Sequence, residues 1–187
     1  MKDLGQTDDA IENYQKAIEI NPSFAHAYNN LGSTLMNLGR RKESIQSYEK
    51  AISIDPKNIL AHINLGSALS SLGQLKAGAK SFEKAIEIDP DFAEAHNSLG
   101  NIFKKFKKRE KALLCYERAY AIKPDMDFVL GSLINIKMHL CIWGDFANSV
   151  QYRLVCKRHA AVFESFEPYL LPPTSRGLPQ SREDPSF

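Results

Sequence analysis

Two histidines are the residues of this chain best suited to metal chemistry, because imidazole nitrogen is a common zinc ligand. His62 and His96 stand 34 positions apart. A closed zinc site requires four ligands, and two imidazoles supply only half of them. The cysteines, Cys115, Cys141 and Cys156, are widely spaced and include no Cys-x-x-Cys pair, which indicates neither a zinc site nor a disulfide framework. We therefore expect packing histidines, no metal or other cofactor, and a reducing compartment.

A dense basic run is the second candidate for chemistry. Residues 104–111 read KKFKKREK, with six basic side chains that could contact phosphates and one aromatic, Phe106, that could stack. The formal charge of the whole chain is only +2, which argues against a nucleic-acid binder. Because Lys107 stands where other units carry Gly39 and Gly73, we interpret the run as a solvated loop between helices. Lysine at a left-handed position costs about 1 kcal/mol relative to glycine, so this turn is expected to be looser or differently closed.

The sequence contains no recognisable catalytic motif. It has no Gly-x-Ser-x-Gly, His-Glu-x-x-His or phosphate-loop pattern, so we expect no enzyme activity from this chain. Residues 1–20 form no signal peptide, and no run of 18 apolar residues indicates a membrane span. With 43% hydrophobic residues, enough for a core, the sequence predicts a soluble, cytoplasmic protein.

A repeat of 34 residues sets the positions of these side chains. Four prolines mark it, at Pro22, Pro56, Pro90 and Pro124. Aromatic, alanine and Leu-Gly columns follow the same spacing: Tyr14, Tyr48, Phe82 and Tyr116; Ala17, Ala51, Ala85 and Ala119; Leu31-Gly32, Leu65-Gly66 and Leu99-Gly100. A period of this length without strand-like segments indicates an all-α array of stacked helix pairs.

One unit of the repeat shows how each pair forms. Its first helix is predicted from Phe24 to Leu38, because apolar side chains recur there at three- and four-residue steps. Gly39 ends that helix, since a residue just past a helix end often needs positive φ. A second helix from Lys42 to Ile54 stops at the Asp-Pro pair that follows, because a residue before proline is pushed out of the α region. Gly32 is expected where the two backbones approach closely, with Tyr48 filling the space beside it.

These columns together resemble the tetratricopeptide repeat (TPR). The resemblance implies a right-handed superhelical solenoid of antiparallel helix pairs. Neither pair can bury its apolar face alone, so each depends on its neighbours. We expect six segments: 1–22, the second helix of a truncated unit; 23–56, 57–90 and 91–124, full units; 125–161, a divergent, lengthened C-terminal helix pair; and 162–187, a proline-rich irregular tail.

The first residues fit the repeat only in part. Met1 aligns with Leu35, inside a first helix, so residues 1–22 supply the tail of one helix, ended at Gly5, and a second helix from Thr7 to Ile20. We interpret the chain as a fragment of a longer array. The alternative is a short protein whose first helix serves as a cap. The bare apolar face of such a fragment predicts end-to-end self-association.

After Pro124 the pattern loosens, although residues 125–143 still look helical. Their stop glycine, Gly144, comes three residues later than the period predicts, so we expect a first helix about one turn longer. Residues 163–187 hold five of the nine prolines and indicate a linker without regular structure.

The same region carries a second resemblance. The segment MHLCIWGDF is similar to the junction between the TPR arm and the catalytic region of O-linked N-acetylglucosamine transferases and SPINDLY-type proteins. The matching residues are Cys141, Trp143, Asp145 and Phe146. The alternative is a generic repeat array that ends in Trp-Gly-Asp-Phe by coincidence. The resemblance implies catalytic lobes that use UDP-GlcNAc in a full-length parent, and this chain lacks them.

The resemblance also implies a binding groove lined by first helices. In that family an asparagine before each Leu-Gly hydrogen-bonds the main chain of an extended polypeptide. The matching positions here are Asn30, Asn64, Ser98 and Ser132, and one turn on stand Ser33, Ser67, Asn101 and Asn135. The bland alternative is that these are solvated surface residues. A carboxylate clamp, the other TPR binding mode, needs lysine or arginine at positions that here hold His26, Asn29, Asn30, Leu60, Ile63 and Asn64.

We therefore expect a protein-interaction module that binds other proteins or peptides in extended form. The narrower expectation is the substrate-recruiting arm of an O-linked N-acetylglucosamine transferase-like protein. The alternative is a free-standing TPR adaptor or assembly scaffold. Nucleic acid and membrane are not expected among its partners.

Overall fold

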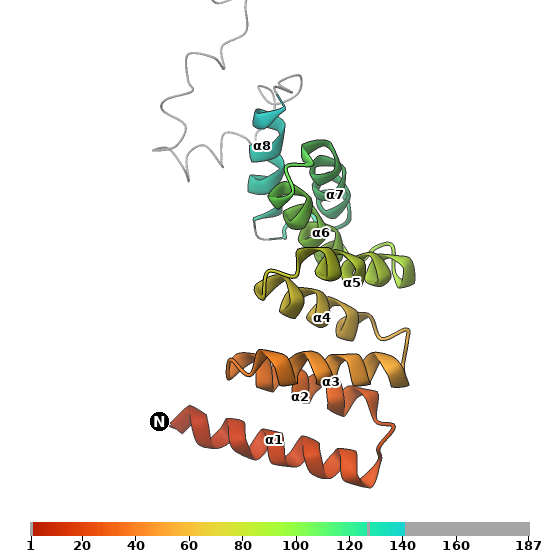
Figure 1. Cartoon of the computed structure of the whole chain (residues 1–187). Helices are drawn as coiled ribbons and strands as arrows, with labels where there is room; N and C mark the ends of the chain where they lie inside the picture. The colour runs from red at the N-terminus through yellow and green to blue at the C-terminus, as the bar shows by residue number, and fades with distance from the viewer. Residues whose placement is uncertain (1, 127, 141–187) are drawn as a thin grey trace, which may run out of the picture. The chain divides into compact units, whose positions relative to one another are not determined.

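The computed structural model describes residues 2–126 and 128–140, in which the chain forms α-helices and no strand (Figure 1). The chain divides into two compact units, Met1–Ile136 and Lys137–Phe187, and the helix pairs lie in the first unit. The helices are α1 (Lys2–Ile20), α2 (Ala25–Asn37), α3 (Arg41–Ile54), α4 (Ile59–Ser71), α5 (Leu75–Ile88), α6 (Ala93–Lys105), α7 (Arg109–Ile122) and α8 (Val129–His139). We call α2, α4, α6 and α8 first helices and the others second helices.

The turn between α2 and α3 forms as the glycine predicts. Gly39 has φ +75°, and its N–H donates to the Met36 carbonyl at 3.0 Å. The Arg40 N–H donates to the Leu35 carbonyl at 2.9 Å, which completes a Schellman motif. The helix bounds match the predicted ones within about one residue, and the all-α prediction is confirmed.

The first helices α2, α4 and α6 each pack closely on the following second helix at a glycine. A Cβ added to Gly32 would lie 2.7 Å from the Tyr48 ring. The same holds for Gly66 against Phe82, at 2.8 Å, and for Gly100 against Tyr116, at 2.8 Å. The predicted close approach of the two backbones at Gly32 is therefore confirmed, and the other two pairs repeat it.

Lys107 occupies the glycine position of the third turn. Its φ is +59°, so the predicted left-handed conformation is confirmed. Its N–H donates to Lys104 at 3.0 Å, and the Lys108 N–H donates to Phe103 at 2.9 Å. The expectation of a looser turn was wrong, because these two bonds match those of the glycine turns and hold the lysine in the same geometry.

The first helix corrects a second expectation. α1 runs without a break from Lys2 to Ile20, through Gly5, where we expected a helix to end. A glycine ends a helix where the chain must turn back onto a packed partner. At Gly5 the chain makes no such turn, and the helix continues through it.

The described part of α8 is not longer than the other first helices. It has 11 residues, against 13 in α2, α4 and α6, and Leu140 lies in a turn. The expected extra turn, Gly144 and the rest of segment 125–161 lie outside the described residues, as does the tail 162–187. Those predictions stay predictions.

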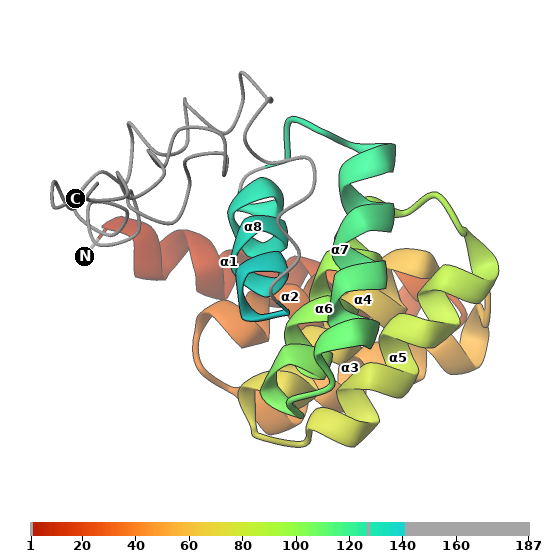
Figure 2. The same ribbon diagram turned by 90° about the horizontal axis from the view of Figure 1, so that it is seen from above.

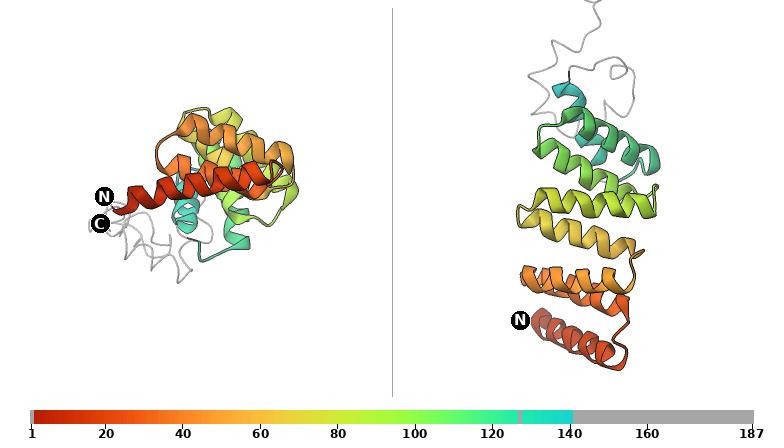
Figure 3. Two further views of the ribbon diagram at one scale, coloured as in Figure 1. Left: turned by 90° about the horizontal axis from the view of Figure 1, so that it is seen from below. Right: turned by 45° about the vertical axis from the view of Figure 1, so that its right-hand side comes forward.

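Within α1 to α7 the helices succeed one another in chain order (Figures 1 and 3). Contacts join successive first helices, α2 with α4 and α4 with α6, whereas successive second helices lie further apart. The exposed face of the first helices is therefore the inner side of this array. Figure 2 shows the same helices seen from above, where successive layers overlap in the view.

The core is a strip between neighbouring pairs rather than a central ball. Tyr48 of α3 packs with Leu65 of α4, and Phe82 of α5 packs with Leu99 and Ile102 of α6. The second helices α3 and α5 thus bury their large side chains against the following first helix as well as against their own partner.

Candidate functional site

The polar residues predicted to line a groove all lie on first helices. In the column before Leu-Gly, Asn30 is exposed, whereas Asn64, Ser98 and Ser132 are half-buried. In the column one turn on, Ser33 is half-buried and the other three are exposed: Ser67, Asn101 and Asn135. The structure brings some of them together, in local arrangements between successive first helices.

The first arrangement ties α2 to α4. The Asn64 side-chain Nδ2 donates to Asn29 Oδ1 at 3.0 Å and lies 3.4 Å from Ser33 Oγ. The Tyr48 hydroxyl donates to the same Ser33 Oγ at 3.2 Å. Asn64 and Ser33 are therefore already engaged within the protein. The sequence did not indicate Asn29, which is buried, as a member of this arrangement. The one feature that could have indicated it is that a second asparagine stands directly before Asn30.

The second arrangement, between α4 and α6, has the opposite character. Ile63 stands in the place of Asn29, Phe82 in the place of Tyr48, and Ser98 in the place of Asn64. Ile63 and Phe82 carry no polar group, the Ser98 side chain is shorter than that of Asn64, and the bonds seen between α2 and α4 are not formed. A recess of about 160 Å³ lies here, which we call the α4/α6 recess. Its lining residues are Ser67, Ser70, Phe82, Ser98, Asn101, Ile102 and Lys105.

The orientation of the Asn101 amide follows from Tyr116. The buried Tyr116 hydroxyl donates to Asn101 Oδ1 at 2.8 Å. Burial raises the pKa of Tyr116 to about 12, and a hydrogen bond with Ser132 opposes that rise, so the phenol keeps its proton at neutral pH. With its oxygen engaged, Asn101 presents its Nδ2 donors on the exposed side of α6.

The two histidines have a packing role, as expected. His62 is 8% exposed, and its Nε2 lies 3.1 Å from the Pro56 carbonyl oxygen. His96 repeats this contact with the Pro90 carbonyl at 2.9 Å. Each imidazole fastens the turn before its own helix. Among residues 2–126 and 128–140, no three His, Cys, Asp or Glu side chains gather as a metal site would require.

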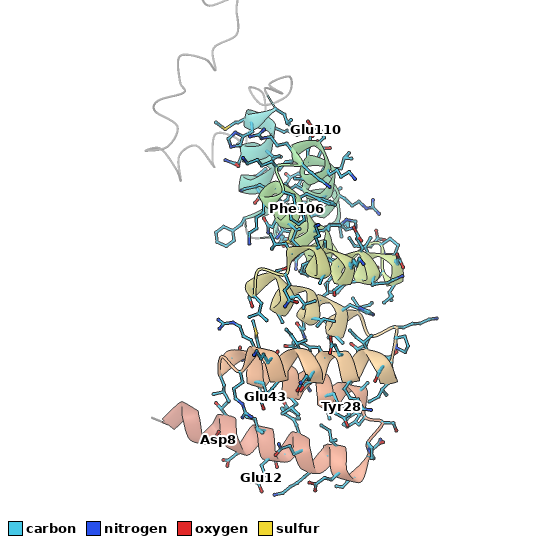
Figure 4. The ribbon with its side chains drawn as sticks, in the orientation of Figure 1. Asp8, Glu12, Tyr28, Glu43, Phe106 and Glu110 are labelled. Carbon is cyan, nitrogen blue, oxygen red and sulfur yellow. The ribbon has the colours of Figure 1, made fainter. Side chains whose placement is uncertain are left out.

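The basic run forms the end of α6, the following turn and the start of α7. Figure 4 labels Phe106 and Glu110 in this region. The lysines and the arginine of the run are exposed, and Lys111 Nζ lies 5.8 Å from the centre of the Phe103 ring. The predicted solvated loop between two helices is confirmed. Lys105 differs from the other members of the run because it lines the α4/α6 recess.

Of the three cysteines, Cys115 lies within the part of the chain that the structure describes. Its surroundings do not favour nucleophilic chemistry. Burial raises the pKa of its thiol to about 11, and the nearby Glu83 acts in the same direction. The thiol is therefore protonated at neutral pH. Cys156 and the junction motif, Cys141, Trp143, Asp145 and Phe146, lie outside the described residues.

Three comparisons with known proteins bear on this arrangement. The family model described as "TPR repeat" matches residues 2–39 and 66–105. Two described as "Tetratricopeptide repeat" match 25–58 and 93–126, and 47–78. No curated protein matches the sequence. Within the described part of the chain, no helix is long and apolar enough to span a membrane.

Solved structures show the same fold at low identity. A crystal structure of MamA is 24% identical, with a TM-score of 0.72, over 86% of this chain and 94% of that one. The first TPR of Spaghetti (RPAP3), bound to the HSP90 peptide SRMEEVD, is 23% identical with a TM-score of 0.61, over 63% and 93%. The Arabidopsis OM64 TPR domain is 16% identical with a TM-score of 0.60, over 62% and 95%. Because the family matches together span residues 2–126, more than half of the 187 residues, this chain belongs to the tetratricopeptide repeat family.

Proposed function

We propose that the first helices bind an extended polypeptide along the inner side of the array. Packed helices lie about 8–10 Å apart. An extended chain advances about 3.3 Å per residue, so roughly every third residue of a bound peptide faces a new first helix. Amide and hydroxyl side chains complement the N–H and C=O groups that every peptide carries, which makes such contacts tolerant of peptide sequence.

The observation that carries this proposal is the α4/α6 recess. It brings together three residues expected to line a groove, Ser67, Ser98 and Asn101. In the described part of the chain neither serine hydroxyl has a hydrogen-bond partner, and Asn101 keeps its amide donors available. Surface polar groups held on rigid helices suit recognition better than groups on loops, because their positions are fixed before binding.

The peptide in the RPAP3 structure belongs to that protein, but it illustrates that this fold can hold a peptide. The mode we propose here is contact with the peptide main chain rather than capture of a C-terminal carboxylate. First-helix positions that would supply cations for a clamp carry neutral side chains, such as Asn29, Leu60 and Ile63.

The test uses the full chain and peptides selected for binding to it. Twelve-residue peptides are selected from a random display library, and the affinity of the tightest one is measured by fluorescence anisotropy. Replacing Ser67 and Ser98 together by alanine removes two hydrogen bonds and should weaken binding about tenfold. Ser53, exposed on the second helix α3, supplies the matched control Ser53→Ala, which should change nothing. Unchanged affinity of the double variant would refute the proposal.

The structure changes which asparagine is informative. Replacing Asn30 and Asn64 together would not separate a loss of binding from a loss of stability. Because Asn64 bonds Asn29, its removal also destabilises the protein. Asn30→Ala alone is the cleaner variant, since this side chain is exposed and accepts only a long hydrogen bond, from Asn29 Nδ2 at 3.4 Å.

A narrower proposal concerns the parent protein. The junction motif and the Asn30 and Asn64 positions support a substrate-recruiting arm of an O-linked N-acetylglucosamine transferase-like protein. The alternative, a free-standing adaptor or scaffold, needs no further domain. Reading the coding DNA beyond Phe187 in all frames separates them. Sequence with alternating strands and helices supports the transferase, and an in-frame stop with no such sequence nearby contradicts it.

End-to-end self-association remains a proposal of its own. Ile20, at the end of α1, is 86% exposed, so apolar surface is present at this end of the array. Sedimentation across a hundredfold range of concentration should show a rising mass, and Ile20→Lys should abolish that rise. A constant monomer mass would refute it.

A further inference from the structure

We infer that the α4/α6 recess receives an anionic side chain of the bound polypeptide, either a glutamate or aspartate carboxylate or a phosphate. The inference rests on the proposed function and specifies one position of the ligand. The polar groups of this recess that lack a partner can each donate a hydrogen bond, and its only charged group is a cation.

Hydroxyl and amide groups supply the neutral donors. Ser67 and Ser98 each offer a hydroxyl without a partner in the described part of the chain. Asn101 offers its Nδ2, because its Oδ1 accepts from Tyr116 at 2.8 Å. Ser70 differs, since its hydroxyl already donates to the Gly66 carbonyl at 2.7 Å. Three donors thus converge from two helices, and carboxylate and phosphate oxygens accept several bonds at once.

Lys105 supplies the positive charge. It lines the recess and forms no ion pair with any described residue. No carboxylate lines the recess to neutralise it. The acid on the same helix, Glu94, lies at its other end and pairs with Lys123 at 3.4 Å. The unpaired cation is therefore available to a ligand.

The lysine distinguishes this step from the preceding steps of the array. The positions that match Lys105 on the preceding first helices are Asn37 and Ser71, both neutral. The basic run that continues beyond Lys105 adds positive potential around the same end of α6. A bound peptide would consequently meet neutral donors along α2 and a cation-centred pocket at α6, which fixes its register.

The size of the recess suits a side chain rather than a whole residue. Its volume of about 160 Å³ is about ten times the space of about 10–15 Å³ that a single water needs. That space accommodates a carboxylate or phosphate group with the carbons that attach it to a main chain running over the recess.

The experiment is a charge scan of one peptide. The tightest peptide from the library selection is acetylated and amidated, so that only side chains carry charge, and glutamate or glutamine is placed at each position in turn. At one position glutamate should bind about fivefold more tightly than glutamine, and phosphoserine should exceed serine there. If the affinity rises with only one of the two anions, that result identifies whether the recess takes a carboxylate or a phosphate.

Matched lysine variants assign the gain to the recess. Lys105→Gln should abolish the preference, whereas Lys80→Gln, which removes an exposed charge from α5, should keep it. No preference at any position, or one that survives Lys105→Gln, overturns the inference while main-chain binding stands. Failure of every peptide to bind overturns the proposed function itself.

Discussion

Replacing Lys107 by glycine is expected to stabilise this protein. Lys107 adopts φ +59° in a turn whose two hydrogen bonds match those at Gly39 and Gly73, where φ is +75° and +77°. A left-handed conformation costs a residue with a Cβ about 1–2 kcal/mol. Glycine avoids this cost in the folded state and keeps the turn unchanged.

The net gain is smaller, because glycine also gives the unfolded chain more freedom, worth about 0.4–1 kcal/mol. The difference is a stabilisation of about 0.5–1 kcal/mol. With a urea m-value of about 2 kcal/mol/M, the unfolding midpoint should rise by roughly 0.3–0.5 M at an unchanged m-value. Urea denaturation followed by circular dichroism measures it.

Two controls isolate the backbone. Lys107→Ala removes the charge and the long side chain but keeps a Cβ, so its midpoint should stay close to that of the parent. Gly73→Lys should lower the midpoint by a similar amount, because a Cβ there meets nothing within 4 Å and the cost is conformational. If Lys107→Gly is no more stable than Lys107→Ala, the reasoning from φ is refuted.

Three further predictions follow. Tyr48→Phe should lower the free energy of unfolding in urea by about 1 kcal/mol, because Ser33 loses a hydrogen-bond donor. Phe82→Tyr should leave that free energy unchanged or raise it, because the new hydroxyl can reach Ser67. A loss of stability in Phe82→Tyr and none in Tyr48→Phe would contradict the comparison of the two steps. Asn64→Ala should lower the free energy of unfolding by about 1–2 kcal/mol, whereas the stability of Asn30→Ala should stay close to that of the parent protein. Equal stabilities of the two variants would show that the bond from Asn64 to Asn29 contributes nothing. Burial raises the pKa of Cys115 to about 11 and of Tyr116 to about 12. Because the unfolded chain loses these protons at lower pH than the folded protein, stability should fall as pH rises above about 9. Melting followed by circular dichroism from pH 7 to 11 measures this, and a melting temperature that rises with pH would contradict it.

Much of the fold could be predicted because each column has one physical cause. Only a residue without a Cβ fits at Gly32, because an added Cβ would lie 2.7 Å from the Tyr48 ring. The Leu-Gly and aromatic columns therefore specify the packing of a pair. The period also placed Lys107 in a left-handed position. It could not show that this turn closes like the others, since two backbone hydrogen bonds decide that and they depend on no side chain.

The site was less predictable because it arises between units rather than within one. Asn64 donates to Asn29, a residue 35 positions away and one position off the repeat, so no column reveals the pair. The α4/α6 recess exists because three residues differ together from the preceding step: Ile63, Phe82 and Ser98. Each substitution alone is unremarkable in sequence, and only their common location exposes the hydroxyls of Ser67 and Ser98.

The most direct test of the central claim is where a bound peptide lies on the protein. The ¹⁵N-labelled chain is titrated with the tightest library peptide, and amide chemical shifts are assigned and followed. The account predicts that the largest changes fall on the inner side of α2, α4 and α6, at Asn30, Ser67, Ser98 and Asn101, while the exposed faces of α3, α5 and α7 stay unchanged. Saturable shifts confined to those second helices, with none at the α4/α6 recess, would contradict it.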